Sequence, residues 1–223
     1  TGVTWKRLDM LALAEAIDAM GGPETSGRFD FGTADSPLAS GYTRVSPATT
    51  YSAEQGYGWT DGSLDSRNRP DGTDITRDFC FSGDATFAAD LASDTYQVKI
   101  TLGDMAYSFR DNMRIYLEGQ LVDTVTTWTG ITHTGVYTVN VADQQLNVRL
   151  VDDEGLSQIV CINELVALPR GPQVTEASVA DVTTNVLSSI TLTFNEAIDA
   201  DDFTPADVLG FSGGGPHALA TAC

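Results

Sequence analysis

Apolar and polar residues alternate along most of the chain between residues 78 and 168. The clearest case is the segment TYQVKITLGD, in which Tyr96, Val98, Ile100 and Leu102 alternate with polar residues. This period of two indicates a strand with one buried and one wet face. Other short segments of this kind are DFCFS, ATFAADL, MRIYLEGQLVDTV, GVYTVNV, QLNVRLVD and IVCINELVAL. Because they follow at close spacing without helical segments between them, we predict an all-β fold, an antiparallel β-sandwich.

The segment before these strands, residues 28–59, opens the same domain. It begins with a short strand pattern, Phe29-Asp30-Phe31, and ends with Gly56-Tyr57-Gly58-Trp59. Two glycines let the backbone bend sharply, so we expect Tyr57 and Trp59 to lie on a loop. Residues 60–77 are polar and rich in turn dipeptides, which predicts a long surface loop.

The two ends of the chain differ from this central part. Residues 4–20 carry apolar side chains at helical spacing and are stopped by Gly21-Gly22-Pro23, which predicts an N-terminal helix. Leu168-Pro169-Arg170-Gly171-Pro172 is a linker pattern, and about 50 residues follow it, too few for a sandwich of ~100 residues. We therefore divide the chain into a helix and linker (1–26), a β-sandwich (27–168), and a linker with an incomplete β-domain (169–223).

The charge of the chain limits its partners. Twelve Lys and Arg stand against 31 Asp and Glu, giving a formal net charge of −19. Such a surface repels nucleic acid, and it suits neutral ligands or divalent cations, or simply maintains solubility. No run of 18 apolar residues exists, so we expect no membrane insertion. Cys80 and Cys161 both lie in strand patterns, where they are either bridged or buried as thiols.

Several of these segments together resemble one family. They are FDFG, GYTRV, TYSAEQGYGW, RDFCFSGDATFAADL, TYQVKITLGD, IYLEGQLVDTV and VCINELVAL. In this order they are similar to the galactose-binding-like domain of β-agarases and rhamnogalacturonan acetylesterase-type esterases. The resemblance implies a jelly-roll sandwich that serves as an accessory module of a secreted or cell-surface polysaccharide-acting protein. The tail segment ITLTFNEAIDADDFTPADV is similar to bacterial Ig-like domains.

Catalytic chemistry has little support in the sequence. The chain contains two histidines, His133 and His217. The esterases of the resemblance place a Gly-Asp-Ser nucleophile motif in a separate domain, and neither Gly83-Asp84-Ala85 nor Gly103-Asp104-Met105 carries that serine. We therefore expect this chain not to be an enzyme.

Polysaccharide binding needs aromatic rings that stack on sugar C–H faces, and polar groups that reach the hydroxyls. The loop DMAYSFRDN, the segment TTWTG and the Tyr57/Trp59 loop supply such groups, although each aromatic could instead pack on the sandwich edge. The predicted ligand-binding residues are Asp104, Tyr107, Phe109, Arg110, Asp111, Asn112, Trp128, Tyr57 and Trp59.

The resemblance also implies a structural calcium ion where the first and last strands of such sandwiches meet. In this chain that position would bring together Asp30, Asn163 and Glu164, which otherwise hydrogen-bond the strand ends. The leading hypothesis is a secreted, non-catalytic module that binds a polysaccharide or other glycan. The alternative is a structural subunit of an extracellular filament or surface layer, which would self-assemble through the N-terminal helix and the incomplete C-terminal domain.

Overall fold

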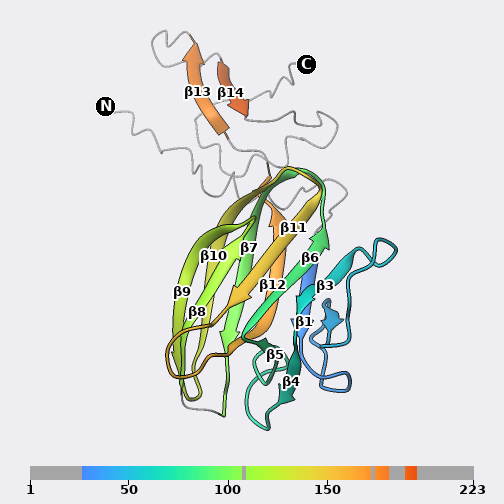
Figure 1. Ribbon diagram of the computed structural model, residues 1–223. Helices are drawn as coiled ribbons and strands as arrows, with labels where there is room; N and C mark the ends of the chain where they lie inside the picture. The colour runs from blue at the N-terminus through green and yellow to red at the C-terminus, as the bar shows by residue number, and fades with distance from the viewer. Residues whose placement is uncertain (1–26, 107–108, 172–173, 181–188, 195–223) are drawn as a thin grey trace, which may run out of the picture. The chain divides into compact units, whose positions relative to one another are not determined.

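The computed structural model describes residues 27–106, 109–171, 174–180 and 189–194, and within these ranges all regular structure is β-strand (Figure 1). The predicted helix at residues 4–20 and most of the predicted Ig-like segment lie outside the described residues. Glu24–Pro169 form one compact unit. Beyond it, β13 (Val174–Ala180) and β14 (Ser189–Phe194) form an antiparallel pair.

The compact unit is a sandwich of two sheets, which confirms the predicted all-β fold. The five-stranded sheet has the order β3 (Tyr57–Gly62), β6 (Asp84–Asp90), β11 (Gln145–Val151), β8 (Phe109–Leu117), β9 (Gln120–Trp128). The seven-stranded sheet has the order β10 (Thr132–Val141), β7 (Asp94–Gly103), β12 (Val160–Pro169), β1 (Gly27–Phe31), β2 (Thr43–Val45). Its remaining strands are β5 (Asp78–Ser82), which pairs with β12, and β4 (Asp65–Asn68), which pairs with β5.

The core lies between the sheets and is built from the inward half of each alternating strand. Tyr96, Val98, Ile100 and Leu102 of β7 are all at most 1% exposed, as their period of two predicts. On the other sheet, the ring of Phe87 contacts three aromatic rings edge-on, those of Phe29, Phe31 and Trp59. Each fully buried large side chain contributes about 1.5–3 kcal/mol, so this interior accounts for a compact unit that needs no disulfide.

Two predictions made from residues 28–82 are changed by the structure. Trp59 lies in β3 and is 4% exposed, because the β3–β6 pairing turns its ring into the core. The polar segment 60–77 is not a continuous loop, since β4 forms within it and pairs with β5. Cys80 and Cys161 are unbridged buried thiols, which decides the alternative left open by the sequence.

Strand β12 has two successive neighbours along one edge. β5 pairs with its beginning and β1 with its remainder, so the end of β1 and the start of β5 meet beside the middle of β12. The pairing of β12 with β7 is irregular at this level, between Ile162 and Glu164. We call the meeting point, marked by Asp30, Asp78 and Asn163, the strand junction.

Candidate functional site

Several connections converge on one end of the sandwich. The β7–β10 and β8–β9 pairs bring Gly103 opposite Thr132 and Phe109 opposite Trp128. The loop between β11 and β12 joins them, because the backbone N–H groups of Leu156 and Ser157 donate to the Asp111 carboxylate. We call residues 104–106, 109–112, 128–132 and 152–159 the loop end. It holds most of the residues predicted to bind a ligand.

Asp104 connects several segments of the loop end through buried hydrogen bonds and ion pairs. Its side chain has no exposed surface and accepts two hydrogen bonds from Arg69 (3.0 and 2.9 Å), one from Arg110 (3.1 Å) and one from the N–H of Ala106 (3.0 Å). Burial alone would raise the pKa of Asp104, but the hydrogen bond from Arg69 and the other donors hold it below its ordinary value. Asp104 therefore positions the loops and is covered from solvent, so it does not reach a ligand directly.

An aromatic pair lies at the same end of the sandwich. The ring centroids of Phe109 and Trp128 are 4.8 Å apart at 52°, and Trp128 is 60% exposed. The neighbouring apolar side chains of Ile131 and Leu156 are 55% and 87% exposed. A large ring that is held by a neighbour and still faces solvent is the arrangement that sugar stacking requires.

The polar residues beside the aromatic pair have separate roles. The Asp111 carboxylate is bound by the N–H groups of Leu156 and Ser157, and these bonds lower its pKa. Gly155 makes this close approach possible, because its φ is +85° and a Cβ there would lie 2.3 Å from an Asp111 oxygen. Asn112 is half-buried with φ 54°. The Arg110 side chain is 16% exposed and is engaged by Asp104, so among these polar residues Asn112 is the one that we retain as a candidate for contact with ligand hydroxyls.

The other predicted aromatics are not brought to this end. Trp59 is a core residue whose indole N–H donates to the carbonyl of Ser46 at 3.1 Å. Tyr57 is half-buried against Phe29, with ring centroids 5.3 Å apart. Burial and packing thus remove both from the candidate binding surface, and Tyr107 lies outside the described residues. Arg69, Ile131 and Leu156 were not predicted, although the turn-rich composition of their loops was the available signal.

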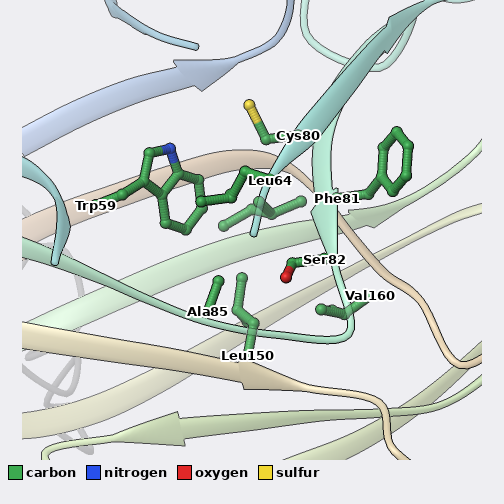
Figure 2. Close-up of a pocket in the computed structure, with 9 residues that line it drawn as sticks. Trp59, Leu64, Cys80, Phe81, Ser82, Ala85, Leu150 and Val160 are labelled. Atoms are coloured by element: carbon green, nitrogen blue, oxygen red, sulfur yellow. The ribbon is translucent and has the colours of Figure 1, made fainter. Parts of the chain in front are cut away.

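One hollow between the sheets is a gap in the apolar core and not a ligand site. Figure 2 shows Trp59, Leu64, Ala85 and Leu150 turned towards one another, with Cys80 and Phe81 on opposite sides of their strand. Its lining is apolar and it leaves no space that would admit a water molecule. It is a loosely packed part of the core.

His133 does not form a catalytic group with the residues described around it. Its Nε2 approaches Asp123 to 3.4 Å without hydrogen-bond geometry, and Asp123 instead accepts a hydrogen bond from Tyr137 at 2.7 Å. All three side chains lie on the β9–β10 edge of the sandwich. The geometry within the described residues therefore gives no nucleophile paired with this imidazole.

The strand junction holds buried oxygen atoms that lack partners. Asp30, Asp78 and Asn163 are at most 2% exposed, and Oδ1 of each has no hydrogen-bond partner among the described residues. Their other polar atoms are engaged: Asp30 accepts from the N–H of Ala39, Asp78 from the Ser36 hydroxyl, and Asn163 donates to the carbonyl of Asp78. Desolvation raises the pKa of Asp30, and it raises that of Asp78 to about 6.

Glu164, the third residue predicted to bind metal, is engaged elsewhere. Its carboxylate contacts Lys99 at 2.8 Å, accepts from Thr101 at 2.8 Å, and is hydrogen-bonded by the Tyr42 hydroxyl. Burial would raise its pKa, but these three partners hold it below its ordinary value. Lys99 already balances the charge of Glu164. Asp78, and not Glu164, is therefore the carboxylate that fits a metal ligand beside Asp30 and Asn163.

The strand junction fits a calcium ion in the chemistry of its donors. Carboxylate and amide oxygens are the ligands that Ca²⁺ takes in proteins, and buried oxygens without partners are costly unless something satisfies them. Among the described residues no three His, Cys, Asp or Glu side chains form a metal site by themselves. A cation at the junction would therefore need the amide of Asn163 and backbone or water oxygens beside Asp30 and Asp78.

Comparisons with known proteins agree with the fold. The sequence model of the family described as "Beta-agarase/YXIM esterase-like, galactose-binding domain-like" matches residues 27–161. Beta-agarase A of Zobellia galactanivorans is 36% identical over 131 residues, which are 56% of this chain and 23% of that protein. The chain therefore spans about a quarter of the length of this curated relative.

Among solved structures, the YXIM protein of Bacillus subtilis is similar with a TM-score of 0.52 and 22% identity. The match covers 65% of this chain and 40% of that one. At this level of identity the likeness shows a shared fold. No helix in the described part of the chain is long and apolar enough to cross a membrane.

Proposed function

We propose that this chain, which belongs to the β-agarase/YXIM esterase-like, galactose-binding domain-like family, holds polysaccharide at its loop end. The observation that carries the proposal is the exposed ring of Trp128, which packs on Phe109 at the loop end, where Asp104 is bound by Arg69 and Arg110. A sugar ring would lie against Trp128, while polar groups of the neighbouring loops, Asn112 among them, would bond its hydroxyls. The buried ion pairs keep the loops in place before the ligand arrives, which limits the entropy lost on binding.

The same proposal makes the module non-catalytic and extracellular. Its support is the family, whose name refers to galactose binding, and the similarity to a protein named β-agarase. A further support is that the loop end presents no base beside a nucleophile within the described residues. The module would hold its polymer close to a catalytic domain and leave bond cleavage to that domain.

Affinity electrophoresis in gels containing agarose or another galactan tests this function. The wild-type chain should be retarded, and Trp128→Ala should migrate as in a gel without polysaccharide. Val136→Ala is a matched control, because Val136 is also an exposed apolar residue (59%) but lies on β10 of the other sheet. Equal retardation of wild type and Trp128→Ala would contradict the proposal.

We also propose that a structural calcium ion binds at the strand junction through Asp30, Asp78 and Asn163. The ion would neutralise two desolvated carboxylates and fix the loop of residues 32–39, which already donates to both through Ala39 and Ser36. A ligand present at 100 times its dissociation constant stabilises the folded state by about 2.7 kcal/mol. The ion would act on folding and not on the sugar.

Thermal unfolding in calcium and in chelator tests the junction. The wild-type melting temperature should fall in chelator, while that of Asp78→Asn should be nearly the same in both buffers. Asp65→Asn is the control, since Asp65 is an exposed carboxylate on the neighbouring strand β4. A wild-type melting temperature that ignores calcium would show that the junction holds no such ion.

A further inference from the structure

The platform at Trp128 continues down the outer face of the five-stranded sheet. On β8, Met113, Ile115 and Leu117 point into the core, so Arg114 and Tyr116 point outward. Cross-strand pairs place Arg114 opposite Thr124 of β9. Thr124 and Thr126 are exposed on the same face of β9 as Trp128, because Val125 and Thr127 between them are buried.

A second aromatic group lies at the far end of this face. Tyr116 is directly opposite Arg149 of β11, and the guanidinium of Arg149 lies 5.8 Å from the centroid of the Tyr116 ring. Two hydrogen bonds of 2.9 and 2.6 Å hold Arg149 to Asp84. About half of the Arg149 side chain is nevertheless exposed, so it keeps surface for a ligand.

The surface between the two aromatic groups is polar and balanced in charge. Arg114 is paired with Asp153, as Arg149 is with Asp84, so two arginines face two aspartates. This balance contrasts with the net charge of −19 of the whole chain. We call the residues that line this surface the outer track: Trp128, Thr126, Thr124, Arg114, Tyr116 and Arg149.

We infer that a polysaccharide bound at Trp128 extends along the outer track to Tyr116 and Arg149. The inference rests on the proposed function, and it specifies the ligand class. Phe109 and Tyr116 are seven positions apart on β8, which is roughly 20 Å of strand and far longer than one sugar ring. The module therefore recognises the interior of an extended, uncharged polysaccharide, with stacking at both ends of the track and hydroxyl contacts between them.

Calorimetric titration with agarose-derived oligosaccharides of increasing length tests the outer track. Wild-type affinity should rise with length until the track is filled. Tyr116→Ala should bind short oligosaccharides as wild type does and lose about fivefold in affinity for long ones, the size of one aromatic contact. Arg149→Ala is a second variant at the same end, and its exposed position makes normal folding expected. Val136→Ala, on the other sheet, should behave as wild type.

The outcomes separate the track from the function on which it rests. If Trp128→Ala abolishes binding while Tyr116→Ala and Arg149→Ala bind long oligosaccharides as wild type does, the track is wrong and the loop end stands. If affinity does not depend on length, the track is also wrong. If Trp128→Ala binds every length normally, the proposed function itself fails. A loss confined to long ligands in both Tyr116→Ala and Arg149→Ala supports the track.

Discussion

The loop end and the strand junction both bury carboxylates beneath a loop, but they satisfy them differently. Asp104 accepts hydrogen bonds from two arginines and a backbone N–H, so its charge is matched within the protein. Asp30 and Asp78 have one engaged oxygen each, and Oδ1 of each has no partner among the described residues. The pKa of Asp104 is lowered and those of the junction pair are raised, each in the direction that its partners dictate.

The difference lies in how the buried charge is compensated. A carboxylate that is fully paired by arginines fixes the surrounding loops and keeps the same charge over the physiological pH range. The pKa values of Asp30 and Asp78 stay raised even though the charge of Arg44 acts on both carboxylates, because the cost of their burial is larger than the stabilisation that Arg44 provides. The loop end therefore has its buried charge matched within the protein, whereas the strand junction keeps two desolvated carboxylates with raised pKa values, the feature on which the proposed calcium site rests.

The largest expected effect is at the loop end, in Asp104→Ala. Removing the carboxylate leaves the guanidinium groups of Arg69 and Arg110 mostly buried and without their shared counter-charge, and breaking a buried pair costs about 3–5 kcal/mol. Urea denaturation should show a loss of this size. Asp65→Ala removes a carboxylate from the exposed Arg67–Asp65 pair and should leave the midpoint unchanged. Similar midpoints for the two variants would show that the buried Asp104 pairs stabilise the fold no more than the exposed Asp65 pair does.

The next effect is a pH dependence of stability at the strand junction. The pKa of Asp78 is about 6 in the folded chain against 3.8 for the ordinary carboxyl. Between these values the unfolded chain releases the proton and the folded chain keeps it, so stability falls as pH rises from about 4 to about 6. In chelator the loss should reach about 3 kcal/mol. Carboxylates with a lowered pKa, such as Asp104, change the stability only at pH values below this range.

The variant Asp78→Asn isolates this contribution, because asparagine does not titrate. Its free energy of unfolding, measured in urea at a series of pH values in chelator, should change less between pH 4 and 6 than that of wild type. The carboxyls of Asp30, Glu118 and Asp152, whose pKa values are also raised by desolvation, remain in both proteins and supply the residual slope. Parallel curves for the two proteins would mean that Asp78 does not carry the raised pKa.

The sequence predicted the parts of this structure that depend on a period of two. The alternation of β7 placed Tyr96 to Leu102 in the core. The segment DMAYSFRDN was predicted to be a loop, whereas Phe109–Asn112 begin strand β8, where Phe109 pairs with Trp128 of β9. The sequence could not place Trp59, because two glycines beside an aromatic residue fit a loop and a strand with tight backbone contacts equally well. In the fold Gly58 lies against the backbone of Thr50 and Tyr51, which leaves no space for a side chain.

The role of Asp78 could not be predicted for a different reason. Its meeting with Asp30 depends on β1 and β5 sharing one edge of β12, and this pairing joins residues about 50 positions apart. Glu164 was a reasonable candidate because it lies directly opposite Asp30 across the β1–β12 ladder. Only the side-chain contacts show that the Glu164 carboxylate is already bound by Lys99 and Tyr42.

The smallest expected effect on stability is that of Trp128→Ala, and it sharpens the comparison most. Trp128 is 60% exposed, so its removal should change the free energy of unfolding by only about 0.5 kcal/mol, the usual range for surface positions. Urea denaturation of wild type and variant, run beside the polysaccharide-gel assay, measures both properties on one sample. A large loss of stability would mean that Trp128 supports the sandwich edge through Phe109. A near-normal midpoint with lost retardation would mean that the exposed ring serves the ligand, because the variant would then have lost binding while keeping its fold.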